Sequence, residues 1–179
     1  MKTLSFIVAA ILFISCGSKK LTREHAAELI KAKYPVTIDW DIYTADPDHA
    51  ARALDTKLEQ EGYITLKRKQ TLAEMGTPFI FFTDKAKPYL METPEKDKKI
   101  MVQKVKLAEQ HFGEITGMQM LKNDKKAIVE YTYVYKNVTP FVAISNLKIE
   151  PKESRKAYFA LYDDGWRIVD KPDLDFLVE

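Results

Sequence analysis

The stretch Ala127-Ile128-Val129-Glu130-Tyr131-Thr132-Tyr133-Val134-Tyr135 decides the fold class of this 179-residue chain. It consists mostly of β-branched and aromatic residues, the types that favour strands. Residues 117–122 are expected to form the partner strand, and Asn123-Asp124, a pair typical of a hairpin turn, lies between the two segments. The sequence therefore predicts an antiparallel hairpin with its turn at residues 123 and 124.

A second hairpin is expected near the end of the chain. Residues 158–162 and 166–169 flank Asp163-Asp164-Gly165, which is a strong turn signal. Residues 141–144, which lie between two prolines, are expected to add an edge strand. We therefore expect residues 93–179 to form an antiparallel β domain.

Helix and strand signals alternate in the first half of the chain. Thr22 can cap a helix that runs to Lys33, and Asp46-Pro47 can begin a second helix that ends at Gly62. Strands are expected at residues 36–43, 63–66 and 79–82. This order predicts a small α/β domain at residues 21–92 that resembles a winged helix. The expected fold class is thus α+β, with a winged-helix-like N-terminal half and a C-terminal antiparallel β-sheet.

The segment between the two halves has a different composition. Residues 85–99 are rich in Lys, Pro and Glu, which places the domain boundary here. Residues 100–107 fit either a helical face or a strand, and their β-branched side chains favour the strand.

The first fifteen residues have the layout of a secretory signal peptide, because a positive charge precedes a mostly apolar run at residues 4–14. This run is too short to span a bilayer, which needs roughly 20 residues. Phe13-Ile14-Ser15-Cys16 resembles the lipobox of bacterial lipoproteins. The resemblance implies that residues 1–15 are removed, that Cys16 is diacylated, and that residues 16–20 tether the protein to a membrane. A free cysteine in a cytosolic protein is the alternative.

The composition of the chain bears on its partners and on the compartment in which it is found. Cys16 is the only cysteine, so no disulfide can support the fold. The formal net charge of +2 offers no field suited to nucleic acid, and a helix-turn-helix would need one more helix before the first hairpin. Gly17 follows the cysteine, which in related lipoproteins argues for the outer membrane and a periplasmic position. Surface exposure is the alternative, and an envelope protein is a candidate partner.

Lys67, Arg68 and Lys69 form a local basic cluster between two expected strands. Such a cluster attracts anionic headgroups or acidic wall polymers, and each basic residue near an anionic membrane contributes about 1 kcal/mol. A solvated turn is the alternative, because lysine is abundant along the whole chain.

Tyr131, Tyr133 and Tyr135 alternate along their strand and are expected to share one face of the sheet. If Trp166 joins that face, together with Tyr158 and Tyr162, the sheet presents an aromatic surface that can stack on sugar rings or grip a peptide. The alternative is that the tyrosines cover a half-buried sheet and contact the N-terminal half.

Signatures of enzymes are missing from the sequence. His25, His49 and His111 have no second histidine at metal-binding spacing, and no nucleophile elbow or glycine-rich phosphate loop is present. Asp39 and Asp41 are expected to share the solvent face of a strand. We therefore expect a protein that is not an enzyme and has no cofactor, metal site or catalytic residue.

The segment 159–169 looks like the final hairpin of small secreted cystatin-like and nuclear-transport-factor-like domains. Together with residues 112–117 and 139–141, it makes the chain similar to uncharacterised lipoproteins of the Bacteroidota type. That resemblance implies no functional residues. The expected function is a non-enzymatic binding or scaffolding role at a membrane. The alternatives are a ligand carrier or sensor that uses the tyrosine face, and a cell-wall hydrolase or hydrolase inhibitor with carboxylates converging in a cleft.

Overall fold

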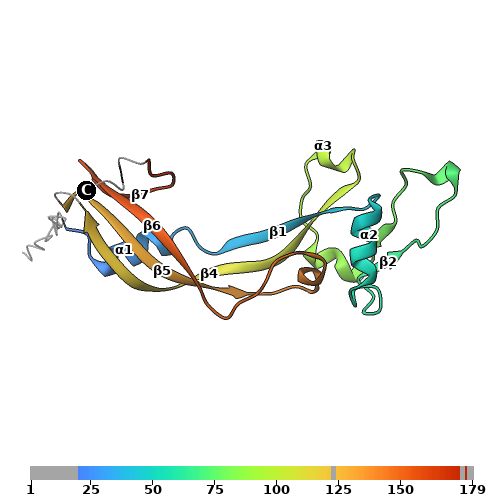
Figure 1. Cartoon of the computed structure of the whole chain (residues 1–179), viewed down its shortest axis with the longest axis horizontal. Helices are drawn as coiled ribbons and strands as arrows, with labels where there is room; N and C mark the ends of the chain where they lie inside the picture. The colour runs from blue at the N-terminus through green and yellow to red at the C-terminus, as the bar shows by residue number, and fades with distance from the viewer. Residues whose placement is uncertain (1–19, 122–123, 174–175, 177–179) are drawn as a thin grey trace, which may run out of the picture.

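The computed structural model describes residues 20–121, 124–173 and 176. The chain has an α+β fold built on a curled antiparallel sheet of five strands, with the spatial order β1-β4-β5-β6-β7. Figure 1 shows an elongated body with α1 and β7 at one end and α2 and β2 at the other. The strands of this sheet are β1 (Val36–Tyr43), β4 (Val102–Leu121), β5 (Lys126–Lys136), β6 (Glu153–Tyr162) and β7 (Gly165–Val169).

Strand β4 is the spine of the molecule, because its 20 residues reach from one end to the other. Its first half pairs with β1, from Tyr43 opposite Val102 to Val36 opposite Gln110. Its second half pairs with β5, and the register shifts twice between Phe112 and Gly117. Such bulges bend a strand and increase its twist. Each end of β4 is covered by its own helices and contributes to its own hydrophobic core.

The core at one end, here called the α1 core, lies between α1 (Arg23–Lys31) and the strands β4 to β7. Thr22 caps the helix as expected, since its Oγ1 accepts a hydrogen bond of 3.2 Å from the His25 N–H. The apolar stripe of α1 packs on one face of the sheet, which removes the large side chains from water. The residues of this core include Leu21, Ile30, Val129, Phe159 and Trp166.

The core at the other end, here called the distal core, is built on β1 and the first half of β4. Asp46 caps α2 (Pro47–Leu54) with its carboxylate, as the Asp-Pro pair predicts. The expected hairpin is present as β2 (Ile64–Leu66) and β3 (Ile80–Phe82), which form a separate two-stranded sheet. The remaining elements here are η1 (Leu72–Glu74), η2 (Asp84–Tyr89), α3 (Glu95–Lys98) and η4 (Pro140–Ile144).

Several sequence expectations change in the structure. The strand favoured for residues 100–107 is confirmed from Val102 onward. The edge strand expected at residues 141–144 is wrong, because this segment is the short 3-10 helix η4. Thr139 accepts a hydrogen bond from the Phe141 N–H and Pro140 occupies the first turn, so the segment starts as a helix. Its i and i+3 residues, Phe141 and Ile144, are both buried.

The winged-helix-like arrangement expected for the first half is not confirmed. Helix α2 ends at Leu54, and the chain reaches Gly62 through turns in place of a longer helix. Strand β1 lies in the same sheet as β4 to β7. The segment between β1 and β4 is thus an insertion between neighbouring strands, and the expected boundary near residue 92 falls between two strands that pair in one sheet.

Candidate functional site

A cavity of about 270 Å³ opens between the C-terminal end of α1 and the sheet face formed by β5, β6 and β7. We call it the Arg155 pocket. Its apolar wall comes mainly from α1, β6 and β7, and its polar groups come from β5, β6 and the residues just after α1 and β7. The lining residues on which the following argument depends are Ile30, Tyr34, Tyr131, Arg155, Ala157 and Ile168.

The polar groups of this pocket converge from different elements. The hydroxyls of Tyr34 and Tyr131 lie 3.0 Å apart and share a hydrogen bond. Arg155 is directly opposite Tyr131 in the β5–β6 register, so both side chains point to the same face. The Arg155 guanidinium lies 4.6 Å from the ring centroid of Tyr133, a cation–π contact. Tyr133 in turn donates a hydrogen bond of 2.7 Å to the Glu153 carboxylate.

Electrostatically, the pocket is a neutral hydroxyl cluster around one cation. Burial and the hydrogen bond with Tyr131 raise the pKa of Tyr34 well above its usual range. Burial and the bond to Glu153 do the same for the pKa of Tyr133, so both hydroxyls keep their protons at neutral pH. Among the described residues, no carboxylate oxygen forms an ion pair with Arg155, whereas Lys33 and Asp170 at the rim pair at 2.6 Å. The pocket therefore carries a net positive charge.

The sequence-predicted aromatic residues separate into two groups. Tyr131 and Tyr133 lie on the α1 side of the sheet and are 6 % exposed each. Trp166 is on the same side but is buried in the α1 core. Tyr135 lies beyond the pocket, where its hydroxyl is 3.2 Å from the Gln110 Nε2 donor. Tyr158 and Tyr162 alternate with the residues that face α1, so their side chains point to the other side of the sheet, although Tyr158 also borders the Arg155 pocket.

Two residues of the pocket were missed by sequence reasoning. The apolar run at 158–162 predicts a strand that begins at Tyr158, whereas β6 begins at Glu153. Arg155 therefore lies outside the expected strand. The alternation of Arg155, Ala157 and Phe159 is a usable signal once the strand is extended backwards. Tyr34 lies in the loop after α1 and has no such signal.

The predicted basic cluster is present but partly neutralised. Lys67 forms an ion pair of 2.6 Å with Glu74, and Arg68 forms one of 2.5 Å with Glu59. The bond from Lys67, as the largest cause, and the hydrogen bonds from Thr71 lower the pKa of Glu74 to about 2. Lys69 is exposed and forms no ion pair within the part of the chain that the structure describes. Only one of the three cations is thus left for an outside partner.

Asp39 and Asp41 share a strand face, where both contact Lys104 at 2.5 and 2.9 Å. This pairing raises the pKa of Lys104 above its usual range. His49 lies beside them in a cavity of about 280 Å³, and its Nδ1 accepts a hydrogen bond of 3.3 Å from the Tyr43 N–H. Burial lowers the pKa of His49, which favours the neutral ring. The two carboxylates are therefore committed to an ion pair with one lysine.

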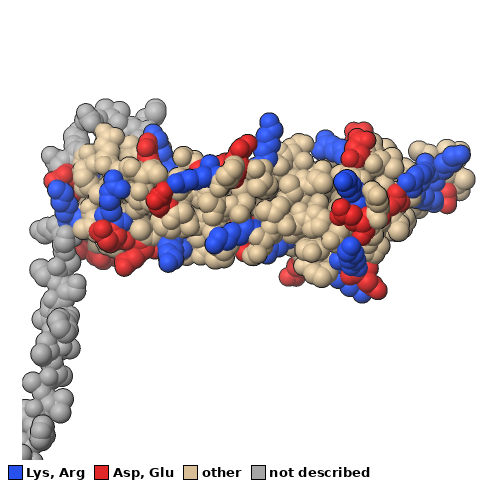
Figure 2. Space-filling model, turned by 90° about the horizontal axis from the view of Figure 1, so that it is seen from below, with Lys and Arg blue, Asp and Glu red and all other residues tan. Residues whose placement is uncertain are grey.

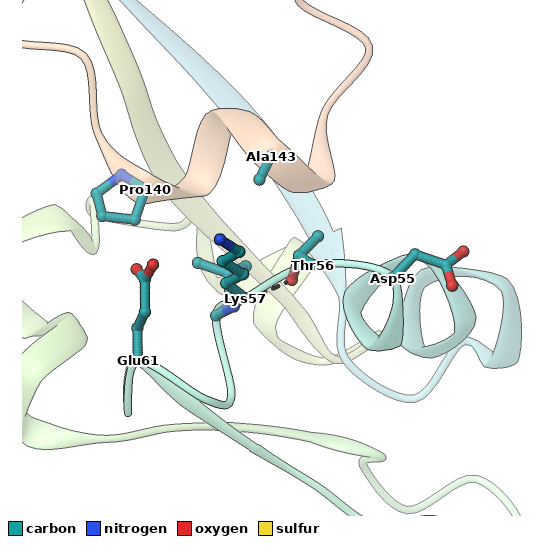
Figure 3. Close-up of a pocket in the computed structure, with 7 residues that line it drawn as sticks. Asp55, Thr56, Lys57, Glu61, Pro140 and Ala143 are labelled. Carbon is teal, nitrogen blue, oxygen red and sulfur yellow. Dashed lines mark hydrogen bonds between the residues drawn. The ribbon is translucent and has the colours of Figure 1, made fainter.

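A further cavity, of about 340 Å³, lies between the segment after α2 and η4. Figure 3 shows the Glu61 carboxylate directed toward Pro140, whereas Asp55 points away from it. Lys57 lies between them in the same view, so charges of both signs line this surface. Carboxylates do not converge in it as they would in a hydrolase cleft.

Cys16 lies outside the described residues. Within residues 20–121, 124–173 and 176, no three His, Cys, Asp or Glu side chains are grouped closely enough to hold a metal ion. None of the helices in that part of the chain is long and apolar enough to cross a membrane. No protein-family model, curated protein or solved structure matches the chain.

Proposed function

We propose that the chain is a lipid-anchored, non-enzymatic envelope protein that binds a small amphipathic carboxylate in the Arg155 pocket. Its anchor would be a diacylglyceryl group on Cys16, with the folded part facing the periplasm from the outer membrane. The lipobox-like residues 13–16 and the signal-like residues before them support this location. The binding role rests mainly on one observation, the Arg155 guanidinium in a pocket without a carboxylate partner among the described residues.

An anionic ligand group is the natural complement of this guanidinium. Arg presents a planar fork of N–H donors that fits a carboxylate with two parallel hydrogen bonds. The neutral hydroxyls of Tyr34 and Tyr131 supply further polar contacts beside it. A ligand without a negative charge would leave the cation without such a partner, so the pocket favours acids over their neutral analogues.

The remaining walls define the other half of the ligand. Ile30, Ala157 and Ile168 are apolar and face the same cavity, so they suit a hydrocarbon body. Pockets for drug-sized molecules enclose about 300–1,000 Å³, and the cavity here is slightly smaller. The proposed ligand class is therefore a short-chain or aromatic monocarboxylate, and the protein would act as its carrier or sensor.

Isothermal titration calorimetry of the full chain with octanoate and phenylacetate tests the binding role. The neutral amides of the same acids serve as the comparison. We expect the acids to bind and the amides to bind at least tenfold more weakly, since a charged hydrogen bond contributes about 1.5–3 kcal/mol. Equal binding of acids and amides, or no binding of either acid, would refute the proposal.

A pair of matched variants assigns that binding to the pocket. Arg155→Gln should remove the preference for acids, because it removes the cation while keeping a similar length. Arg167→Gln is the control, since Arg167 is exposed and pairs with Asp164 outside the pocket. Loss of binding in both variants would place the ligand elsewhere. Fatty-acid labelling that persists after Cys16→Ser would contradict the proposed anchor.

A further inference from the structure

The loop of residues 67–78, between β2 and β3, displays two large apolar side chains to solvent. Leu72 is 86 % exposed and Met75 is 71 % exposed, more than any other large apolar side chain in the described part of the chain. Figure 1 shows this loop, in green, projecting from the end of the molecule that lies opposite α1. Single exposed apolar residues are ordinary, but two on one projecting turn mark a contact surface.

Hydrogen bonds hold this loop in one shape. The Glu74 carboxylate accepts hydrogen bonds from the Thr71 N–H at 2.9 Å and from Lys67 at 2.6 Å. Gln70 donates to the Thr77 carbonyl at 2.8 Å and so joins the two arms of the loop. The short helix η1 lies between these bonds and presents Leu72. The apolar side chains are thus displayed on a preorganised turn, which lowers the entropy lost when they bind.

The charge of the loop is positive where it faces outward. Glu74 is the only acid among residues 64–83, and it is occupied by Lys67. Arg68 is paired with Glu59, which lies outside the loop. Figure 2 shows basic side chains at the tip of this end of the molecule. Lys69 remains available to an anionic partner, and no acidic side chain of the loop is left to repel one.

These features fit a lipid surface better than a protein partner. A specific protein interface buries about 1,600 Å² in total, far more than two side chains on a convex turn can supply. A fluid bilayer needs no pocket of matching shape. It can take up the apolar side chains of a projecting turn while its anionic headgroups attract the nearby Lys69. We propose that residues 67–78 form a membrane knuckle that inserts Leu72 and Met75 into an anionic lipid surface.

Tryptophan fluorescence of the full chain can test this contact. Cys16→Ser is included so that no acyl chain contributes, and Leu72→Trp adds a probe to the native Trp40 and Trp166. With vesicles of phosphatidylethanolamine and phosphatidylglycerol, we expect the Leu72→Trp difference spectrum to shift to shorter wavelength. Vesicles of phosphatidylcholine alone should give a smaller shift. An unchanged difference spectrum on the anionic vesicles would overturn the proposal.

Vesicle co-sedimentation supplies the quantitative test with a matched control. In the same Cys16→Ser background, the double variant Leu72→Ser, Met75→Ser should partition onto the anionic vesicles at least tenfold more weakly, because two apolar side chains no longer enter the lipid. Lys69→Gln should weaken it about fivefold. Val138→Ser is the control, as Val138 is 48 % exposed and lies outside the loop. Equal partitioning of the double variant and the control would contradict the knuckle, and the Arg155 pocket would remain unaffected.

Discussion

The distal core depends on Phe141, so truncating this side chain should destabilise the whole chain severely. Phe141 is fully buried, and its ring lies 6.1 Å from those of Tyr63 and Tyr89 and 5.9 Å from that of Phe82, between centroids. Phe→Ala substitutions in a packed core cost about 3–5 kcal/mol. We place Phe141→Ala near the middle, about 4 kcal/mol, because three aromatic contacts are lost while the exposed hairpin nearby can partly collapse.

Urea unfolding followed by far-ultraviolet circular dichroism measures this loss. The control is Phe81→Ala, since Phe81 is 46 % exposed on the same hairpin and should cost only about 1 kcal/mol. A loss of less than about 1.5 kcal/mol for Phe141→Ala, or one no larger than that of the control, would refute the reasoning, because a buried Phe in a packed core costs at least about 3 kcal/mol when truncated.

Fluorescence can show whether the two ends of the molecule unfold together. Trp40 packs against the distal core and Trp166 belongs to the α1 core, so each end carries one of the two tryptophans. Because β4 runs through both ends without interruption, we expect Phe141→Ala to lower both transitions. A separate, unshifted Trp166 transition would show that the ends are independent units.

Two further predictions concern pH and the bend of β4. The ion pair with Lys106, the largest cause, lowers the pKa of Glu109 to about 2 from its ordinary 4.5, so its stabilisation is present above pH 4.5 and lost as pH falls toward 2. Glu109→Gln should therefore lower the urea midpoint at pH 7 and lower it much less at pH 2. A Cβ at Gly113 would lie 2.5 Å from Thr132 Oγ1 and 2.9 Å from the Thr132 carbonyl oxygen, so Gly113→Ala should lower the thermal midpoint. The control is Gly117→Ala, whose Cβ would meet only the Glu130 side chain, at 3.2 Å. A midpoint of Gly113→Ala that is no lower than that of the control would contradict the prediction.

Elements with local signals were predictable from the sequence. Thr22 and Asp46 cap helices where expected, and the two hairpins of the C-terminal half pair as the turn residues indicate. These signals act over a few residues, so they can be recognised in the sequence without knowledge of the fold. The end of α2 was placed too late because Gly62 suits a helix end but here serves a turn with φ of +77°.

Long-range pairing was not predictable in the same way. The neighbour of β1 is β4, and 58 residues separate them in the chain, so no turn residue connects the two strands. The lysine-rich segment before β4 has the composition of a linker, yet it only ends an insertion between adjacent strands. The Phe141 segment is a different case, because the Thr139 cap and Pro140 are local signals of a helix start that outweigh its β-propensity.

The residues of the candidate site also divide into those with a local sequence signal and those placed by long-range contacts. The alternation of Tyr131 and Tyr133 correctly places both on one sheet face, because a period of two needs no partner strand. Arg155 becomes part of the site only through the register that sets it opposite Tyr131, and Tyr34 only through the packing of α1. Arg155 and Tyr34, which supply the cation and one hydroxyl of the pocket, are therefore placed by contacts between segments that lie far apart in the sequence.

The proposed contacts together constrain how the protein would lie on its membrane. The first described residue, Lys20, adjoins α1, so the proposed anchor on Cys16 and the Arg155 pocket belong to the same end of the molecule. The four residue steps from Cys16 to Lys20 span at most about 14 Å. The membrane knuckle lies at the opposite end (Figure 1). A body held by so short a tether can bring that knuckle to the same bilayer only with its long axis along the surface. In that orientation the pocket stays close to the lipid, where an amphipathic carboxylate would partition.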